Sequence, residues 1–348
     1  MKISVYEGPK KLVVREVPDM EIQPDEVRIK TLYTGISHGT EMNIYRGYAP
    51  FFSKKYDPDT RLFVKSEEEH LWTYPIRSCD PGVWYLGYSA VGEIIEVGSD
   101  VKHVSCGDIV YTDGPHQSQI IKKEDQVFKL PDGVDPKHAV VFTNLMTCFN
   151  GILDARIKLG DVVVVMGLGV IGQITVQLAI MSGARVIAVD TIEKRRKAAL
   201  ENGAEVVLDP AGTDVAQRVR EMTNNRGADL VIDVSGSYHA LNEAIRTIAP
   251  EQTILALSWY PNEARLILSE EFHHNRVTIK CSQTNYTAPE FAHLWKLERK
   301  REQCMRLLPK LKLDNVVTNV FPFENINEAF AMVDQRPQDV IQCVLEYK

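Results

Sequence analysis

The sequence predicts an α/β fold in which a doubly wound parallel sheet is inserted into a second, β-rich domain. Six short apolar runs alternate with helical stretches from Asp161 onward, whereas about 130 residues before that region read as short strands separated by Gly, Pro and Asp. The chain then returns to a strand pattern at its end. Its 348 residues suit two domains. We expect a sheet domain at 151–285 and an outer domain formed by 1–150 and 286–348.

Each predicted element follows from a local pattern. In the outer domain, EVRIKTLYTG and SAVGEIIEVG alternate as strands do, and 136–159 turns helical before Gly160. The six apolar runs are nearly continuous, as parallel strands covered on both faces require. They lie at 162–166, 185–189, 205–208, 230–234, 253–257 and 277–281, with helical patterns at 170–182, 192–202, 214–223 and 238–247. A charged surface helix near 294–312 and a strand in QDVIQCVLEY complete the chain.

Composition excludes several classes of function. The net charge is −7 and no basic tract stands out, so we expect no nucleic-acid partner. The uncharged stretch 162–184 is long enough for a membrane span, but it holds three glycines and several polar residues, so we expect no membrane association. The start lacks a signal peptide, and the six cysteines are dispersed without a CxxC. We therefore expect reduced thiols and a cytoplasmic location.

The run VVVVMGLGVIGQ predicts a dinucleotide site. It places Gly167, Gly169 and Gly172 in a GxGxxG motif between a buried strand and a helix. The first glycine permits the tight turn, the second lets the backbone approach a pyrophosphate, and the third lets helix and strand pack closely. The helix N-terminus supplies N–H groups for the phosphates. We predict that the whole turn binds cofactor, including Leu168, Val170 and Ile171.

Asp190 predicts NAD as the cofactor. It ends the second strand, 18 residues after Gly172, where an acid binds the adenine ribose. A carboxylate there accepts bonds from a free 2′-hydroxyl and repels a 2′-phosphate. The bases Lys194, Arg195 and Arg196 lie nearby, and a base could accommodate a phosphate.

Together, GISHGTE, GYSAVGEIIEVG, CGDIV and GLGVIG follow one another in an order that resembles the medium-chain dehydrogenase/reductase superfamily, which includes the alcohol and polyol dehydrogenases. The resemblance covers nearly the whole chain. It implies a GroES-like catalytic domain, a Rossmann domain, an active site in the cleft between them, and hydride transfer at nicotinamide C4. It also implies a homo-dimer or tetramer.

Within this resemblance, the chain departs from metal-dependent members. Ser37 stands where they carry a cysteine, Tyr88 and Ser89 where they carry histidine and glutamate, and Thr143 near their third ligand. Catalytic zinc needs about three thiolate, imidazole or carboxylate ligands. The four cysteines of a structural zinc are also missing after CGDIV. We therefore predict no metal site. The GISHGTE stretch is most similar to enzymes of the bacteriochlorophyllide dehydrogenase type.

The resemblance also assigns roles by position. It places Thr40 in a proton relay, with a one-residue insertion in the alignment, and Thr147 against the nicotinamide ring. It places Arg195 near the adenine ribose, and Ser235 and Leu257 near the nicotinamide.

Without zinc, hydrogen-bonding side chains must hold the substrate oxygen and take its proton. We predict Tyr88 as the first candidate, because it replaces a ligand and a cationic nicotinamide would favour its phenolate; the alternative is a tyrosine that only fills space. His38 suits proton relay or phosphate contact. Ser37 and Thr40 would pass the proton along, and Glu41 we expect to be structural.

The segment 42–86 is rich in aromatics, with ten among 45 residues against 8% overall. It suits a lid that stacks on a substrate ring, or alternatively a small core or dimer contact.

These observations predict an NAD-dependent, zinc-independent oxidoreductase. Its small-molecule substrate would be a secondary alcohol on a sugar, polyol or cyclic compound, interconverted with its ketone. Two alternatives stay open: a quinone or enone reductase of the same superfamily, and a non-catalytic NAD-binding sensor.

Overall fold

A computed structural model describes residues 1–65, 73–80, 86–260 and 265–348. The chain divides into two compact units, one of residues 1–140 and 319–348 and the other of residues 141–318. These limits differ from the predicted ones at 150/151 and 285/286. Helix α3 (Phe142–Ala155) packs on α4 (Val170–Met181) and on α9 (Leu297–Leu307), so the predicted limits would separate elements that share a core.

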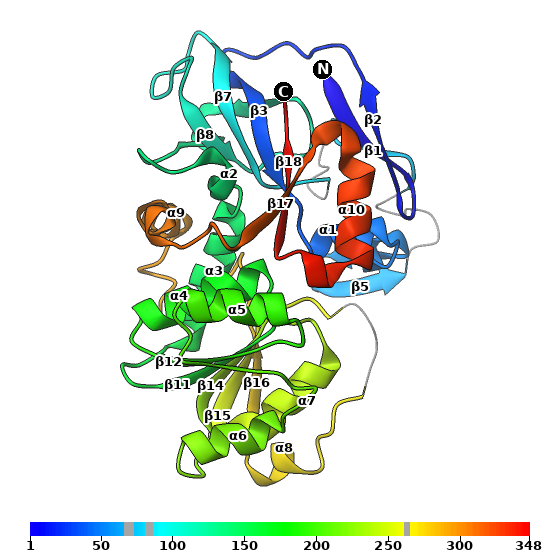
Figure 1. The fold of residues 1–348 in the computed structure, drawn as a ribbon. Coiled ribbons are helices and arrows are strands. Elements are labelled where there is room, and N and C mark those ends of the chain that lie inside the picture. The colour runs from blue at the N-terminus through cyan, green and yellow to red at the C-terminus, as the bar shows by residue number, and fades with distance from the viewer. Residues whose placement is uncertain (66–72, 81–85, 261–264) are drawn as a thin grey trace. The chain divides into compact units, whose positions relative to one another are not determined.

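The second unit contains the predicted doubly wound parallel sheet, which is confirmed (Figure 1). Its strand order is β13-β12-β11-β14-β15-β16, and all neighbouring strands are parallel. The strands are β11 Val162–Met166, β12 Arg185–Val189, β13 Val206–Leu208, β14 Ala228–Asp233, β15 Ile248–Ala256 and β16 Thr278–Cys281. The apolar runs of the sequence marked each strand, although β15 begins five residues before its predicted start.

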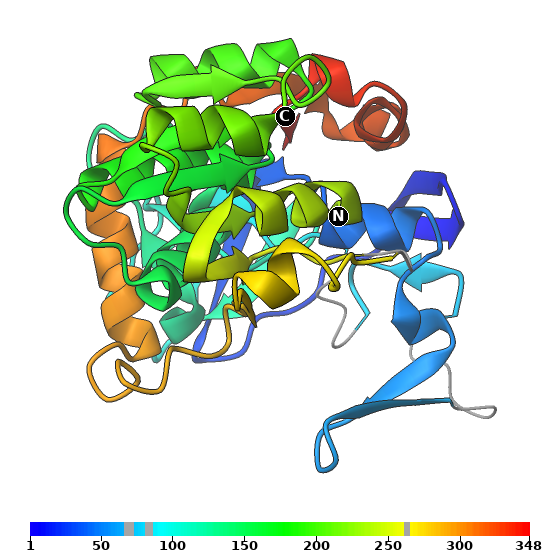
Figure 2. The ribbon, with the colours of Figure 1, turned by 90° about the horizontal axis from the view of Figure 1, so that it is seen from below.

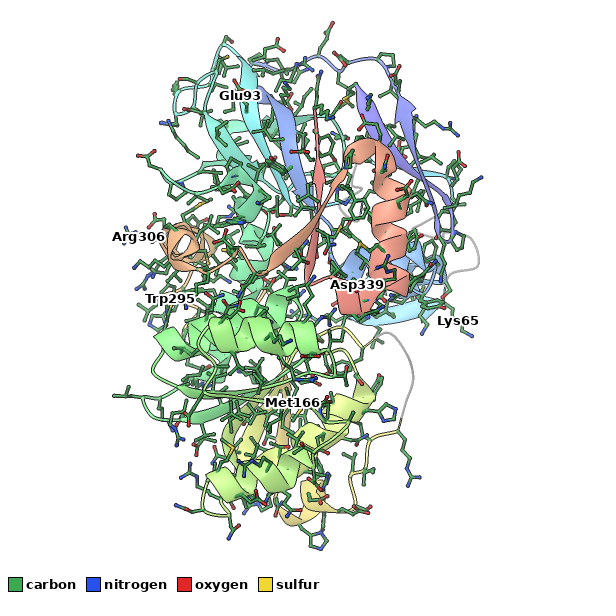
Figure 3. The ribbon with its side chains drawn as sticks, in the orientation of Figure 1. Lys65, Glu93, Met166, Trp295, Arg306 and Asp339 are labelled. Atoms are coloured by element: carbon green, nitrogen blue, oxygen red, sulfur yellow. The ribbon has the colours of Figure 1, made fainter. Side chains whose placement is uncertain are left out.

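Helices cover both faces of this sheet (Figure 1). On one face lie α4 and α5 (Glu193–Glu201), and on the other α6 (Val215–Met222) and α7 (Tyr238–Thr247), with the short α8 (Glu271–His274) beside them. Alternate side chains of β11 enter two apolar cores, Val163 and Val165 the core that includes α4, and Val164 and Met166 the core that includes α6 and α7. Met166, at the carboxyl end of β11, is labelled in Figure 3. A strand buried on both faces requires such an uninterrupted apolar sequence.

The first unit is β-rich, as predicted. One sheet has the order β10-β8-β7-β3-β18-β17 with β9 also paired to β3, and a smaller one has the order β2-β1-β6. Its strands are β1 Lys2–Gly8, β2 Lys11–Glu16, β3 Glu26–Gly35, β6 Ile76–Arg77, β7 Ala90–Val97, β8 Ile109–Thr112, β9 Gln119–Lys123, β10 Val127–Lys129, β17 Val317–Pro322 and β18 Gln342–Glu346. The returning strand β18 pairs with β3, which joins the two ends of the chain in one sheet.

Helices of the first unit are α1 (Thr40–Tyr45), α2 (Pro136–Ala139) and α10 (Ile326–Gln335). Short 3₁₀ turns lie at Pro50–Phe52, Glu124–Gln126, Leu308–Lys310, Phe323–Asn325 and Pro337–Asp339. None of the helices in the described ranges is long and apolar enough to cross a membrane.

The aromatic segment 42–86 divides into two parts. Tyr45 packs on Phe330 of α10 at 5.3 Å between ring centroids, and Phe52 stacks on Tyr74 at 5.2 Å, so this part belongs to a core. The hairpin of β4 (Lys54–Asp57) and β5 (Leu62–Lys65) instead stands out from the body of its unit, with Tyr56 and Phe63 exposed (Figure 2). The predicted aromatics Trp72, Trp84 and Tyr85 lie outside the described residues.

Candidate active site and nucleotide site

The carboxyl ends of the central parallel strands finish level with one another. Met166 is in register with Val189 on one side and with Asp233 on the other, and Asp233 is in register with Ala256. The residues that follow these ends lie along one edge of the sheet, where ligands of such sheets bind. They include four residues that the sequence singled out: Gly167, Asp190, Ser235 and Leu257.

The three motif glycines have different surroundings. Gly167 has a φ of +89°, and a Cβ built on it would lie 2.7 Å from the Ser235 Cα. At Gly172 a Cβ would lie 2.0 Å from the Gly167 carbonyl oxygen, so helix and strand touch there. At Gly169 a Cβ would meet no atom within 4 Å, although its φ of −67° suits any residue. Gly169 is therefore the place where the turn leaves room for a ligand.

The remaining residues of the turn build its inner side. Leu168 is fully buried and Val170 nearly so, both within the sheet's packing. The carbonyl of Ile171 accepts a hydrogen bond from the thiol of Cys148 on α3 at 3.3 Å. The buried side chains of Leu168 and Val170 face the protein, so only the backbone groups of these two residues are available to a ligand.

The Asp190 carboxylate is almost buried and faces the glycine turn. Its Oδ2 accepts the N–H of Leu168 at 2.7 Å, and its Oδ1 accepts the N–H of Ile192 at 2.8 Å. Two carboxylate oxygens offer about four acceptor positions, so hydroxyl donors can still be accommodated. Asp190 thus links the glycine turn to the start of α5.

Two of the neighbouring bases are engaged with carboxylates. The Arg195 guanidinium lies 3.7 Å from Asp190 Oδ2, and burial lowers its pKa from the ordinary value against the opposing effect of Asp190. Arg196 pairs with Asp209 at 3.0 Å and donates to the Asp190 carbonyl at 2.7 Å. Both arginines are therefore held by acids beside the turn.

A buried carboxylate at the end of β14 was missed by the sequence analysis. Asp233 is fully buried, and burial raises the pKa of its carboxyl. It accepts hydrogen bonds from the Ser235 hydroxyl at 2.6 Å and the Tyr260 hydroxyl at 2.7 Å, which fixes Ser235 at the strand end. Only its position at the end of the apolar run LVIDV could have indicated it.

Leu257 and Thr147 lie at the same edge. Leu257 donates its N–H to the Asp233 carbonyl, and its side chain would lie 2.9 Å from a Cβ on Gly151 of α3. Thr147 precedes Gly151 by one helical turn, so the two share a face of α3. The Thr147 hydroxyl donates to the Thr143 carbonyl at 3.1 Å.

In the first unit, three predicted hydroxyls come together. The Tyr88 hydroxyl donates to Ser37 Oγ at 2.5 Å and also hydrogen-bonds Thr40. Ser37 follows β3, Thr40 begins α1, and Tyr88 precedes β7. Because Gly35 donates its N–H to the Ser89 carbonyl at 3.0 Å, the ends of β3 and β7 are held side by side. Each of the three residues is partly exposed, although the phenol oxygen of Tyr88 is itself buried.

The environment of Tyr88 keeps its phenol protonated. Burial first, and then the Glu41 carboxylate, raise the pKa of Tyr88 to about 12, against the lowering effect of the bonds to Ser37 and Thr40. Burial and Glu41 therefore favour the neutral phenol, whereas the predicted phenolate depends on a cationic nicotinamide beside the ring. Tyr88 acts here as a hydrogen-bond donor.

His38 and Ser89 point to other partners. His38 Nε2 accepts the N–H of Cys343 in β18 at 3.4 Å, and the Ser89 hydroxyl donates to the Val140 carbonyl. His38 remains partly exposed beside Ser37. Its proposed catalytic and phosphate roles stay predictions.

Behind the hydroxyls lies a buried acid–imidazole pair, Glu41 and His116. Glu41 Oε1 is 2.8 Å from His116 Nε2, and the two side chains are 0% and 1% exposed. Glu41 Oε2 accepts the N–H of Ser37 at 2.6 Å. The sequence analysis predicted a structural role for Glu41 and did not single out His116, which lies 75 residues away and has no motif around it.

These side chains do not fit a zinc ion. The positions in question carry hydroxyls, which are poor zinc ligands, and the nearby carboxylate and imidazole are bonded to each other. Within the described ranges, no group of three or more His, Cys, Asp or Glu side chains is arranged to hold a metal.

Comparisons with known proteins identify the family. Residues 170–298 match the family described as zinc-binding dehydrogenase. The chain is 34% identical to D-guloside 3-dehydrogenase of Escherichia coli, over 98% of this chain and 99% of that protein. The chain belongs to the zinc-binding dehydrogenase family. It is therefore a member of the medium-chain dehydrogenase/reductase superfamily and an oxidoreductase of the alcohol dehydrogenase type.

A further relative and a solved structure are also similar to this chain. The chain is 28% identical to 2-dehydro-3-deoxy-L-galactonate 5-dehydrogenase of Pseudoalteromonas atlantica, over 99% of this chain and all of that protein. Its fold matches galactitol-1-phosphate dehydrogenase of Escherichia coli with a TM-score of 0.79 at 20% identity, covering 99% and 100% of the two chains. The family name describes zinc-binding enzymes, whereas this chain's donor set does not suit zinc.

Proposed function

We propose that this chain is an NAD-dependent dehydrogenase that interconverts a secondary alcohol, on a sugar, polyol or cyclic compound, with its ketone without a catalytic metal. The observation that carries the metal-free part is the hydroxyl trio of Ser37, Thr40 and Tyr88. These hydroxyls converge where the resemblance places metal ligands and a proton relay, and they are the groups that can hold a substrate oxygen there.

The nucleotide site supports NAD over NADP. Asp190 presents a carboxylate beside the glycine turn, and the two nearest arginines are held by Asp190 and Asp209. A 2′-phosphate would meet a negative charge there, whereas a ribose diol would find acceptors. Gly169 leaves the space that a pyrophosphate needs against the backbone.

Bound NAD would supply the hydride acceptor at the carbinol carbon. The chain's own groups must then hold the oxygen as its proton leaves. The alcohol proton passes to the Tyr88 oxygen while the phenol gives its own proton to Ser37 or Thr40, which pass a proton on to solvent water, so Tyr88 stays protonated and hydrogen-bonded to the new ketone oxygen. In the reverse direction the same relay runs backwards, and Tyr88 protonates the reduced oxygen.

Relatives support a sugar-like substrate. Proteins at 34% and 28% identity over nearly the whole chain are named as dehydrogenases of a guloside and of a deoxygalactonate. Assembly as a homo-dimer or tetramer and a cytoplasmic location remain predictions from the sequence.

The test is turnover of purified protein on a panel of glycosides, sugar acids and polyols, with NAD and NADP compared. The proposal expects NAD reduction by at least one secondary alcohol and clear preference for NADH over NADPH in a binding titration. Preference for NADPH with reduction of quinones would favour the reductase alternative. NADH binding without turnover on any alcohol or ketone would favour the sensor.

A further inference from the structure

The buried pair Glu41–His116 has no role in the mechanism above, yet it occupies the interior directly behind the hydroxyl trio. A buried carboxylate is costly unless its oxygens are paired. Here both oxygens are used, one by His116 Nε2 at 2.8 Å and the other by the Ser37 N–H at 2.6 Å. A leucine or glutamine would fill this interior more simply if packing were all that mattered.

The pair is linked to Ser37 through the backbone. The Ser37 N–H points at Glu41 Oε2, so the carboxylate fixes the turn between β3 and α1. That turn carries Ser37 and leads to Thr40. Moving or removing the carboxylate would therefore move two of the three hydroxyls.

The backbone of the loop that carries His116 is linked to the turn before Tyr88. The backbone N–H of His116 donates to the Leu86 carbonyl at 2.8 Å. Gly87, which has a φ of +106°, lies so close to this loop that a Cβ on it would be 2.7 Å from the backbone nitrogen of His116. The loop that carries His116 thus also sets the turn that carries Tyr88.

The pair is itself anchored to the C-terminal strand region. His116 Nδ1 lies 2.7 Å from Thr34 Oγ1, which lies 3.1 Å from the hydroxyl of Tyr347. Since Nε2 faces a carboxylate, the ring proton lies on Nε2 and the ring cannot turn without losing both contacts. The imidazole therefore bonds two segments directly, at Glu41 and Thr34, and the backbone of its own loop bonds a third at Leu86.

We propose that Glu41 and His116 are positioning residues that hold the Ser37 and Tyr88 hydroxyls in the geometry needed to bind the substrate oxygen, the organising role that a metal ion has in related enzymes. This inference rests on the proposed function. It assigns to the pair no contact with substrate.

The experiment combines a spectroscopic measurement with kinetics. Protein labelled with 3-fluorotyrosine is studied by ¹⁹F NMR, and the Tyr88 resonance is identified by its loss in Tyr88→Phe. Glu41→Gln and His116→Ala are compared with His116→Gln, whose amide can still donate to Glu41. The controls are Glu324→Gln and His103→Gln, which change an exposed carboxylate and an exposed imidazole of the same unit.

The expected result is a shifted Tyr88 resonance in Glu41→Gln and His116→Ala, partial return in His116→Gln, and no change in either control. Loss of such supporting groups lowers activity by about 10- to 100-fold. We expect this loss in kcat, with NADH affinity unchanged.

An unmoved Tyr88 resonance in folded Glu41→Gln and His116→Ala would overturn the inference, and so would a moved resonance with unchanged kcat. If these variants do not fold, Thr34→Val removes the contact to His116 Nδ1 together with the contact to the Tyr347 hydroxyl, and should give the same changes in smaller measure; no change in it would count equally against the pair. Absence of turnover in the parent protein would refute the proposed function, while the resonance would still decide the positioning role.

Discussion

The nucleotide site and the hydroxyl site are built in opposite ways. The nucleotide turn uses backbone groups and glycine spacing within residues 167–190, where Asp190 bonds the N–H of Leu168 only 22 residues away. The hydroxyl site uses side chains from the turn after β3, from α1, from the turn before β7 and from the loop at His116, with bonds that span 51 and 75 residues. In the nucleotide turn, we expect only substitutions at a few glycines to disturb binding. In the hydroxyl site, we expect substitution of any of the hydrogen-bonded side chains to disturb the geometry.

The substitution with the largest expected effect on the hydroxyl site is Tyr88→Phe. If the hydroxyl holds the substrate oxygen, kcat should fall by about 100- to 10,000-fold, the range for proton-transfer groups, with unchanged NADH affinity. Steady-state kinetics and a fluorescence titration of NADH measure the two effects separately. Tyr33→Phe, which removes a hydroxyl bonded to Glu346 in the same unit, is the matched control. A loss below threefold would mean that Tyr88 only fills space.

A second test addresses the charge at the nucleotide site. Asp190→Asn keeps the shape and the acceptor for the Leu168 N–H but removes the negative charge. We expect the preference for NADH over NADPH to fall by about 100-fold, equivalent to ~3 kcal/mol. Arg196→Gln, next to Asp209, serves as a comparison because it alters a base and leaves the carboxylate. An unchanged ratio of the two dissociation constants in Asp190→Asn would show that this residue does not select the cofactor.

A third test separates fold from ligand binding within one motif. Gly169→Ala adds a methyl group into open space at an ordinary φ, so the melting temperature should stay constant while NADH affinity falls by about tenfold, or ~1.4 kcal/mol. Gly172→Ala would place its methyl against the Gly167 carbonyl and should lower both. Gly212→Ala, also in open space but outside the motif, is the control. Equal NADH affinity in Gly169→Ala and the parent would show that the pyrophosphate does not bind at this turn.

The smallest test concerns the stability contributed by a protonated Tyr88. Its pKa is raised to about 12, so between the unfolded value near 10 and about 12 the unfolded chain binds fewer protons, and stability falls as pH rises. At about pH 10.5 this single group should lower the free energy of unfolding by up to about 1 kcal/mol relative to neutral pH. Urea unfolding at both pH values should show a smaller decrease in the free energy of unfolding for Tyr88→Phe than for the parent. Equal losses would show that the environment of Tyr88 does not disfavour its ionisation.

The same contrast explains what the sequence could predict. The parallel sheet was confirmed strand by strand, because strands buried on both faces leave continuous apolar runs such as VVVVM. The glycine turn and Asp190 lie within one strand–turn–helix–strand unit, so spacing alone indicated them. Residues 286–318 were predicted to lie in the outer domain, whereas they lie in the second compact unit, because nothing local in the sequence shows that α9 packs on α3.

Side chains that act through distant contacts gave no such signal. Ser37, Thr40 and Tyr88 were singled out only through the family resemblance, since their meeting depends on the pairing of β3 with β7. His116 and the Asp233–Tyr260 bond were missed, because a lone histidine or aspartate in a sequence carries no sign of its partner across the fold. The protonated state of Tyr88 follows from burial and from Glu41, which only the structure brings together.

The central claim is that hydroxyl groups hold the substrate oxygen in place of a metal. The most direct measurement is the turnover number of protein treated exhaustively with a chelator, with its zinc content determined on the same sample by mass spectrometry. The account predicts undiminished turnover at negligible zinc content, with no gain when zinc is added back. Turnover that disappears with the metal and returns in proportion to bound zinc would contradict it.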